Sequence, residues 1–433
     1  MSIYSVLIVE CLLHPHLLFK PRIQPPQVQL LFVDDTTAGT DAIAGGDRFA
    51  EQARRRAETE REAVEWAIDE LKRVIDEQDV DLEPMLEYAR RSQESLPNRH
   101  LQAYEGMAEV FDVDPDVYDV YVFAYAELCE ELADGDGRSE KNPKGCTNVL
   151  VAPSKVEPDA GVDTGSADTG ASTSGPLVLK NRDIAGRGTR PKSIIEQPPI
   201  DDYYGFLTVD TCGTISTFKG VNDQGLVAAN TYIDSTRDDI DPEDQLRNGT
   251  VIRLVLEECA TVDEARDLLE SYPTRRLSGQ TLFLADATDT ALLEIDPVAE
   301  QIAVDDDPIV TRTNHFVNST STQTESSTKR RKRALELLEG GDQLDRDDLW
   351  AFAQDHANGP SDDSICRHPE PETDKPHAFG QLTTASTAIF NGGSPLIEIG
   401  MGNPCETERT RCVFGEEIPT DLRTGQQWLD RLH

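Results

Sequence analysis

The sequence predicts an α+β protein in which antiparallel sheets are faced by helices. Three observations support this prediction. Hydrophobic residues make up 37% of the 433 residues, which is enough to bury a sizeable core. The first third of the chain has helical periodicity, and the remainder gathers short strands and helices into blocks. Such blocks favour antiparallel sheets over an alternating, parallel fold.

The N-terminal third is expected to be mostly helical. Over residues 48–77, apolar side chains such as Val64, Ile68 and Leu71 recur at three- and four-residue intervals with charges between them. This pattern predicts one long amphipathic helix. Two further helices are expected over residues 82–93 and 117–132.

After residue 146 the chain changes to short β-rich runs separated by Gly and Asp, which predict strands. The low-complexity segment 153–175 cannot bury enough apolar area to offset its ordering entropy, so it is expected to be a flexible loop between two strands. Strands are expected at 149–152, 177–181, 206–209, 214–218, 226–229, 281–284, 291–295, 309–313, 388–391 and 396–400. Helices are expected at 251–258, 262–271, 333–338 and 347–355.

The first residues do not match the rest of the chain. Residues 1–33 are apolar, rich in proline and nearly free of acids, whereas the acidic composition begins at Asp34. Glu10 interrupts the apolar run and a basic start is missing, so a signal peptide is not indicated, and the run is too short to span a membrane. We expect residues 1–33 to be an extension that does not belong to the fold. The favoured explanation is a start site assigned too far upstream, and the alternative is a peripheral membrane anchor. The helical segment is then 34–145 and the catalytic segment 146–433.

The charge of the chain limits its partners. There are 41 Lys and Arg against 81 Asp and Glu, a formal net charge of −40. The carboxylates are spread along the chain, which indicates salt adaptation, because at molar salt a Debye length of ~3 Å screens their repulsion. Nucleic acid is not expected as a partner, since the only dense basic run is Lys329–Arg333. No membrane partner is expected either.

Eight cysteines are scattered without a CxxC pair, which favours a reducing, cytoplasmic location over a disulfide framework. HExxH and EF-hand patterns are also missing from the sequence, so we expect no metal.

Gly145 and Cys146 stand just before an apolar run and are the candidate catalytic feature. A cut between them would give Cys146 both a thiol and a free α-amine, whose ordinary pKa of about 7.7 to 8 suits a base near neutral pH. Glycine lacks a Cβ that would shield an attackable peptide bond. The alternative is a buried cysteine without a catalytic role.

Several short motifs follow Gly145 in a fixed order, and together they resemble one family. It is the isopenicillin-N acyltransferase and acyl-CoA:6-aminopenicillanic acid acyltransferase group, within the N-terminal-nucleophile (Ntn) hydrolases. The motifs are Gly145-Cys146-Thr147, Asn181-Arg182-Asp183, Gly220-Val221-Asn222, Gly225-Leu226, Asn230-Thr231, Thr313-Asn314-His315-Phe316, Ser326-Ser327, Ser364 to Pro369, and Gly402-Asn403-Pro404-Cys405.

The resemblance implies a four-layer αββα Ntn-hydrolase sandwich, made as a precursor and cut between Gly145 and Cys146 into two chains that stay associated. It implies that Cys146 is the nucleophile, that Asn314 and Asn230 stabilise the oxyanion, and that Asp183 orients the new amine. Lys180 stands where related bile-salt hydrolases have an arginine. Substrate-binding or orienting roles are expected for Lys180, Asn181, Arg330 and His315, although the basic run around Arg330 leaves its register open.

The expected function is therefore a self-processing cysteine hydrolase that acts as an amidase or acyltransferase on linear C–N amide bonds through a Cys146 thioester. Its expected partners are a small amide or acyl substrate and its own cleaved N-terminal chain. No cofactor is expected, and acyl-CoA stays open as a co-substrate. Two alternatives remain: a catalytically inactive binding protein of the same fold, and an uncleaved thiol protease that uses a histidine. The substrate, the choice between hydrolysis and acyl transfer, and the oligomeric state stay open.

Overall fold

The computed structural model describes residues 46–134, 144–157, 175–235, 239–319, 323–341, 343–368, 379 and 382–431. The chain divides into two units, residues 1–41 and 42–433, and all the described residues belong to the second. The expected extension 1–33 and residues 158–174 of the low-complexity segment lie outside the described residues.

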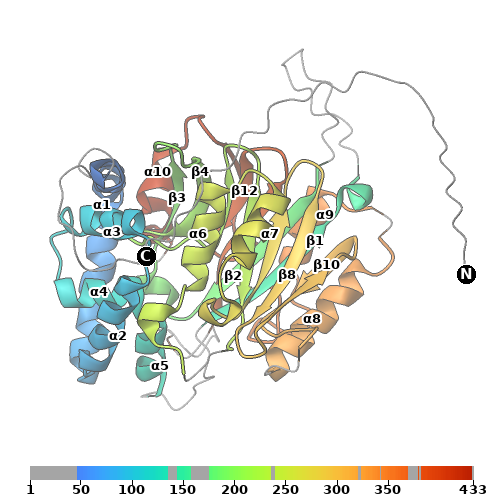
Figure 1. The fold of residues 1–433 in the computed structure, drawn as a ribbon. Coiled ribbons are helices and arrows are strands. Elements are labelled where there is room, and N and C mark those ends of the chain that lie inside the picture. Colours follow the sequence, from blue (N-terminus) through green and yellow to red (C-terminus); the bar gives the residue numbers. More distant parts are fainter. Residues whose placement is uncertain are drawn as a thin grey trace, which may run out of the picture. The chain divides into compact units, whose positions relative to one another are not determined.

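Two antiparallel sheets form the centre of the second unit, as the sequence predicts (Figure 1). The six-stranded sheet has the order β10 (Ile309–Arg312), β1 (Lys144–Val151), β2 (Leu177–Ile184), β11 (Thr383–Asn391), β12 (Leu396–Met401) and β13 (Thr410–Val413). The seven-stranded sheet has the order β3 (Lys192–Gln197), β4 (Phe206–Thr211), β5 (Lys219–Asn222), β6 (Val227–Tyr232), β7 (Gln280–Ala285), β8 (Thr290–Asp296) and β9 (Gln301–Asp305).

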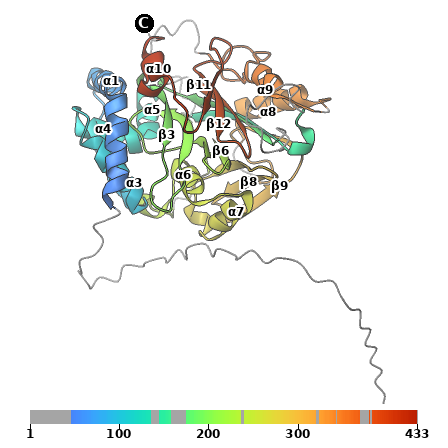
Figure 2. The same ribbon diagram turned by 90° about the horizontal axis from the view of Figure 1, so that it is seen from above.

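The sheets and four helices stack in the order helix, sheet, sheet, helix. Apolar side chains from both sheets, such as Val178 and Phe283, pack in one core between them. A second core joins the outer face of the seven-stranded sheet to α6 (Asn248–Glu258) and α7 (Val262–Glu270). A third joins the other sheet to α8 (Glu325–Leu338) and α9 (Arg346–Ala353), so the two helix pairs lie on opposite sides (Figure 2).

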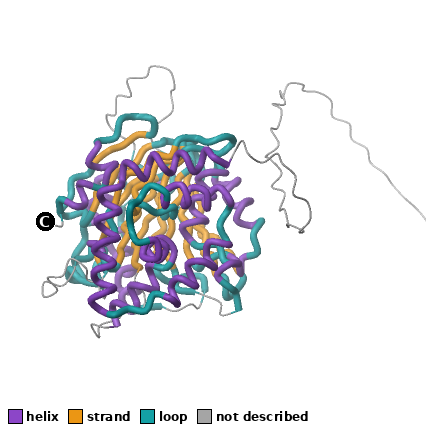
Figure 3. Tube along the Cα trace, turned by 90° about the vertical axis from the view of Figure 1, so that its left-hand side faces the viewer, coloured by secondary structure: helices purple, strands orange, loops and turns teal. Residues whose placement is uncertain are grey.

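The N-terminal helices form a further layer with its own core at one end of the strands. Its members are α1 (Gly46–Gln78), α2 (Glu83–Glu94), α3 (Asn98–Ala108), α4 (Pro115–Phe123) and α5 (Tyr125–Asp134). Figure 3 shows these helices in front of the strands. Leu429 of α11 (Gln426–Leu429), which follows α10 (Thr420–Thr424), joins the same core.

The helix expected over residues 117–132 is divided into α4 and α5 at Ala124. Helix α4 also begins two residues earlier than expected, because the Asp114 side chain accepts hydrogen bonds from the backbone N–H groups of Asp116 and Val117.

The strand expected at 214–218 is wrong, since the structure has an irregular segment there and β5 begins only at Lys219. Arginine side chains of α1 and α6 donate hydrogen bonds to backbone carbonyls of this segment. Arg56 Nη1 donates to the Thr214 carbonyl at 2.8 Å, and Arg253 Nη1 donates to the Ile215 carbonyl at 3.1 Å. These tertiary hydrogen bonds replace the ladder that its β-rich composition predicts.

None of the helices among the described residues is both long enough and apolar enough to cross a bilayer.

Candidate active site

The pairing of β1 with β2 divides the candidate residues between the two faces of the six-stranded sheet. Cys146 lies opposite Arg182, and Asn148 lies opposite Lys180. Opposite residues of an antiparallel pair point to the same face. This face is the inner one, because Asn148 and Lys180 both donate to the main-chain carbonyl of Asn230 on β6, in the other sheet. Gly145, Thr147, Asn181 and Asp183 therefore belong to the outer face.

The Cys146 thiol is buried against a lysine. Lys180 Nζ donates to Cys146 Sγ at 3.3 Å and also lies 3.3 Å from Asn230 Oδ1. Complete burial lowers the pKa of the Lys180 ammonium below its ordinary value. The amine that contacts the sulfur is therefore easier to deprotonate than a lysine in water.

The main chain of Cys146 is held from α8 and from the end of β10. Its N–H donates to Asn314 Oδ1 at 3.0 Å, and its carbonyl accepts from Arg330 Nη1 at 2.6 Å. Arg330 Nη2 donates to the same Asn314 oxygen at 2.9 Å. Arg330 is 1% exposed, so it is the arginine of the basic run 329–333 that contacts Cys146 from inside the protein.

The two asparagines implied as oxyanion donors each use one amide hydrogen on the protein. Asn314 Nδ2 donates to the Tyr232 carbonyl at 2.8 Å, and Asn230 Nδ2 donates to Gln280 Oε1 at 3.0 Å. Because a side-chain amide carries two hydrogens on nitrogen, each asparagine has a second one to offer.

Asp183 packs against Gly145, its partner in the pairing of β1 with β2. A Cβ at position 145 would lie 2.8 Å from Asp183 Oδ2 and 2.7 Å from Arg367 Nη1, so only glycine fits without displacing them. Asp183 Oδ1 accepts from Thr384 Oγ1 at 2.8 Å, and Oδ2 lies 3.4 Å from Arg367 Nε. Buried acidic and basic groups thus pack directly against the bond that precedes Cys146.

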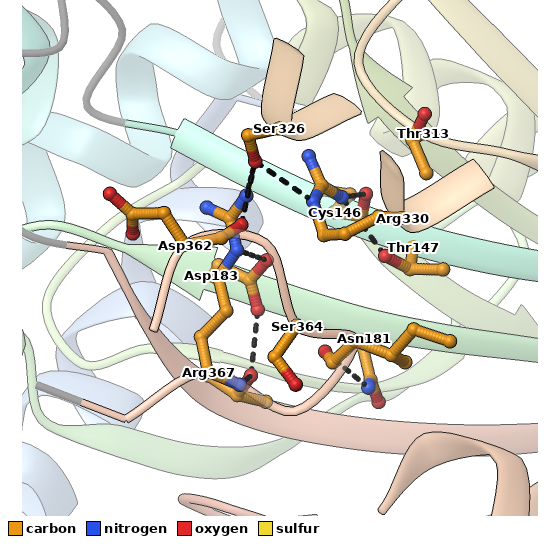
Figure 4. A network of polar contacts seen from close by, with 12 residues as sticks. Cys146, Thr147, Asn181, Asp183, Thr313, Ser326, Arg330, Asp362, Ser364 and Arg367 are labelled. Carbon is orange, nitrogen blue, oxygen red and sulfur yellow. Dashed lines mark hydrogen bonds and ion pairs between the residues drawn. The ribbon is translucent and has the colours of Figure 1, made fainter. Parts of the chain in front are cut away.

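Arg367 is a site residue that sequence reasoning missed. It appears in the sequence only within the motif 364–369, and no local pattern places it near Gly145. Its Nη2 donates to Ser326 Oγ at 2.7 Å, and Arg330 Nε lies 3.4 Å from the same oxygen. Figure 4 shows the two guanidinium groups linked through Ser326, with Asp183 below them.

Asn181 and His315 have structural partners. Asn181 Nδ2 donates to the carbonyls of Ala353 and Ile365 at 3.1 and 3.2 Å, which ties α9 and the following segment to the outer face of the sheet. His315 Nδ1 lies 2.9 Å from Ser327 Oγ, and burial lowers the pKa of His315 to about 4, so its ring is neutral at pH 7.

A pocket opens on the inner face of the sheet at Arg182 and Ile184 of β2. Arg182, whose backbone pairs with Cys146, lines it together with Arg190, Arg247, Tyr125 and Phe218. Arg182 is paired with Asp210, but none of the residues lining the pocket, within the described part of the chain, is acidic. The pocket therefore carries an excess of fixed positive charge, and one of its arginines is the strand partner of Cys146.

The model of the acyl-coenzyme A:6-aminopenicillanic acid acyl-transferase family matches residues 171–378, which confirms the resemblance. The search of curated proteins found no match.

Three solved structures illustrate what the fold is similar to. Penicillin V acylase from Agrobacterium tumefaciens is 16% identical, covering 63% of this chain and 87% of its own, with a TM-score of 0.36. A mutant of conjugated bile acid hydrolase from Clostridium perfringens is 11% identical over 63% of this chain and 99% of its own, with a TM-score of 0.37. The N-acylethanolamine-hydrolyzing acid amidase orthologue of Caenorhabditis elegans is 13% identical over 58% and 94%, with a TM-score of 0.36.

Proposed function

We propose that this protein is a self-processing cysteine Ntn hydrolase, which acts as an amidase or acyltransferase on linear amides through a thioester at Cys146. The family match supports acyl-transfer chemistry. The observation that carries the proposal is the contact of 3.3 Å between Lys180 Nζ and Cys146 Sγ, on a residue directly preceded by a glycine that packs against Asp183.

Self-cleavage needs a base other than Cys146 itself. In the uncut chain the nitrogen of Cys146 is an amide, which cannot accept the thiol proton. Lys180 is in contact with the sulfur, and burial lowers the pKa of its ammonium, so we assign Lys180 as the base that takes that proton in its neutral form. The thiolate attacks the Gly145 carbonyl, and a thioester forms as the Gly145–Cys146 C–N bond breaks, with the nitrogen leaving as an amine protonated by Lys180. Water then hydrolyses the thioester to a Gly145 carboxyl group and the free thiol.

The groups around Cys146 have assigned roles in this step. Arg330 and Asn314 hold the main chain of Cys146 while the bond before it breaks. The second N–H of Asn314 or of Asn230 is the proposed donor to the oxyanion, which is worth ~3 to 4 kcal/mol of barrier for one such group. Asp183, next to Gly145, is proposed to receive the new ammonium once Gly145 is released.

In the mature enzyme the α-amine of Cys146 becomes the base. The thiolate attacks the carbonyl of an amide substrate, the amine product leaves, and water or a second amine accepts the acyl group from the thioester. Of these two acceptors we propose water, so that the enzyme acts mainly as an amidase.

The test of self-processing is denaturing electrophoresis with intact-mass measurement of the purified wild-type protein. We expect a fragment that begins at Cys146 and a second that ends at Gly145. A whole chain that still turns over amides would favour the alternative of an uncleaved thiol protease. Cleaved protein without turnover on any amide or thioester would favour the binding-protein alternative.

The arginine-lined pocket predicts that preferred substrates carry a carboxylate. A carboxylate would compensate the charge of Arg190 and Arg247, and the rings of Tyr125 and Phe218 offer apolar surface to the rest of the molecule. The measurement compares kcat/KM for an N-acyl amino acid and for its methyl ester, at one salt concentration. We expect the free acid to be the better substrate by at least ~10-fold, the value of one charge-assisted hydrogen bond. Equal values for the two would overturn the assignment of this pocket.

A further inference from the structure

Four side chains that ligate metals meet outside the active site. They are His356, Cys366, His368 and Cys405, and one ligating atom of each lies within 4.8 Å of all the others. The first three follow α9, and Cys405 follows β12. The linear sequence contains none of the usual metal-binding spacings, because these residues converge only when the segments after α9 and β12 pack together.

The spacing of the four atoms fits a tetrahedron around one ion. The two sulfurs are 3.7 Å apart, and the Nε2 atoms of His356 and His368 are 3.0 Å apart. Sulfur to nitrogen distances are 3.2 Å from Cys405 to His368, 3.6 Å from Cys366 to His368 and 3.7 Å from Cys405 to His356. Zinc bonds of about 2.0 Å to nitrogen and 2.3 Å to sulfur give tetrahedral edges of about 3.3 to 3.8 Å.

We infer that His356, Cys366, His368 and Cys405 bind one zinc ion in a structural site. Two thiolates and two imidazoles at tetrahedral spacing are a ligand set that selects zinc, and four protein ligands close the site. This inference revises the expectation of no metal that the sequence motifs give.

Neighbouring groups orient two of the ligands. His368 Nδ1 lies 3.5 Å from a Glu406 carboxylate oxygen, which leaves Nε2 to face the cluster. The side-chain amide of Asn403 lies 3.8 Å from Cys366 Sγ, in position to donate to a thiolate. Such partners, which fix the ring and neutralise part of the sulfur charge, usually accompany metal ligands.

A zinc ion bound here would hold Arg367 of the candidate active site in place. Arg367 lies between the ligands Cys366 and His368, and its guanidinium contacts Asp183 and Ser326. Asn403 Nδ2 donates to the Arg367 carbonyl, which ties the two parts of the cluster together. The proposed role of the ion is therefore to hold Arg367 in place behind Gly145, as a positioning element without contact to the substrate.

The test is the zinc content of the full-length protein. It is measured by inductively coupled plasma mass spectrometry after dialysis against metal-free buffer at constant salt. We expect about one zinc per chain in the wild type and near zero in Cys405→Ser and His356→Ala. Cys412→Ser is the matched control, because Cys412 is a free cysteine on β13 outside the cluster. Cys412→Ser should keep the zinc of the wild type.

Cobalt gives a second readout that does not depend on activity. Protein refilled with Co²⁺ should have the intense visible bands of a tetrahedral thiolate site, and Cys405→Ser should lose them while keeping the far-UV circular dichroism of the wild type. Folded wild-type protein without bound zinc, or with an intact mass lower by two hydrogens from a Cys366–Cys405 disulfide, would overturn the inference.

The same measurement on Cys146→Ala separates this inference from the proposed function. A chain that cannot cleave itself should still bind about one zinc, because the cluster does not include Cys146. Zinc in an uncut, inactive wild-type protein would overturn only the proposed function, whereas cleaved and active protein without zinc would overturn only the metal site.

Discussion

Cys146→Ala is expected to yield one uncut chain that turns over no amide. The variant removes the sulfur that both the self-cleavage and the thioester require, while the small apolar side chain still fits the buried position. Loss of a nucleophile that acts in this way reduces the rate by at least ~10⁴-fold. Electrophoresis detects the uncut chain, and release of amine from an N-acyl amino acid measures the turnover.

Two companion variants make this result specific. Cys146→Ser should cut slowly and incompletely, because a hydroxyl is a weaker nucleophile than a thiol near neutral pH. Cys412→Ala should cut and turn over like the wild type, since Cys412 lies in the core between the sheets, away from the site. A Cys146→Ala chain that appears as two fragments would refute self-cleavage by this residue.

Lys180→Met is expected to slow self-cleavage by ~10² to 10⁴-fold, the usual contribution of a positioned general base. Methionine keeps the length and the buried stem of the lysine but removes the amine that contacts Cys146 Sγ. The rate is measured from the disappearance of the precursor after synthesis in a cell-free system. Lys192→Met is the matched control, because Lys192 is also buried and contacts Thr211 rather than the thiol.

The pH profile distinguishes a base from a structural lysine. Neutral Lys180 is the active form, so the cleavage rate should rise tenfold per pH unit below its pKa and level off above it. Burial lowers that pKa, which moves the plateau to lower pH than an ordinary lysine would give. Lys180→Arg should show no plateau at accessible pH, because a guanidinium stays protonated. Cleavage of Lys180→Met at the wild-type rate would contradict the proposed role.

Helices with a regular apolar stripe were predictable, whereas elements defined by their neighbours were not. The pattern of residues 48–77 predicts α1 with ends within two residues of the observed ones. The sequence pattern predicts no helix over residues 98–108, where the structure has α3, and Gly106 lowers the helix propensity of this segment. The packing of α3 against α1 requires this glycine, because a Cβ at position 106 would collide with the Ala50 carbonyl oxygen. Strand β9 is an edge strand with two exposed and no buried positions, and it lacks the apolar alternation that reveals a half-buried strand.

The candidate site divides in the same way. Gly145 and Cys146 are adjacent in the chain, so the sequence alone suggests them as a candidate cleavage site, and the ordered motifs add Asn230, Asn314 and Asp183 as candidates. The antiparallel register of β1 and β2 brought Lys180 onto the sulfur and kept Asp183 on the opposite face, which local patterns do not specify.

The sequence by itself determined the antiparallel α+β class, the acidic charge and the glycine–cysteine pair, because each depends on composition or on residues close together in the chain. Only the tertiary structure decided that Arg330 is the buried arginine of its run and that Arg367 reaches Gly145. It also brought His356, Cys366, His368 and Cys405 together. The physical reason is that these contacts join distant segments, and their geometry is set by sheet register and by how helices and loops pack on the sheets.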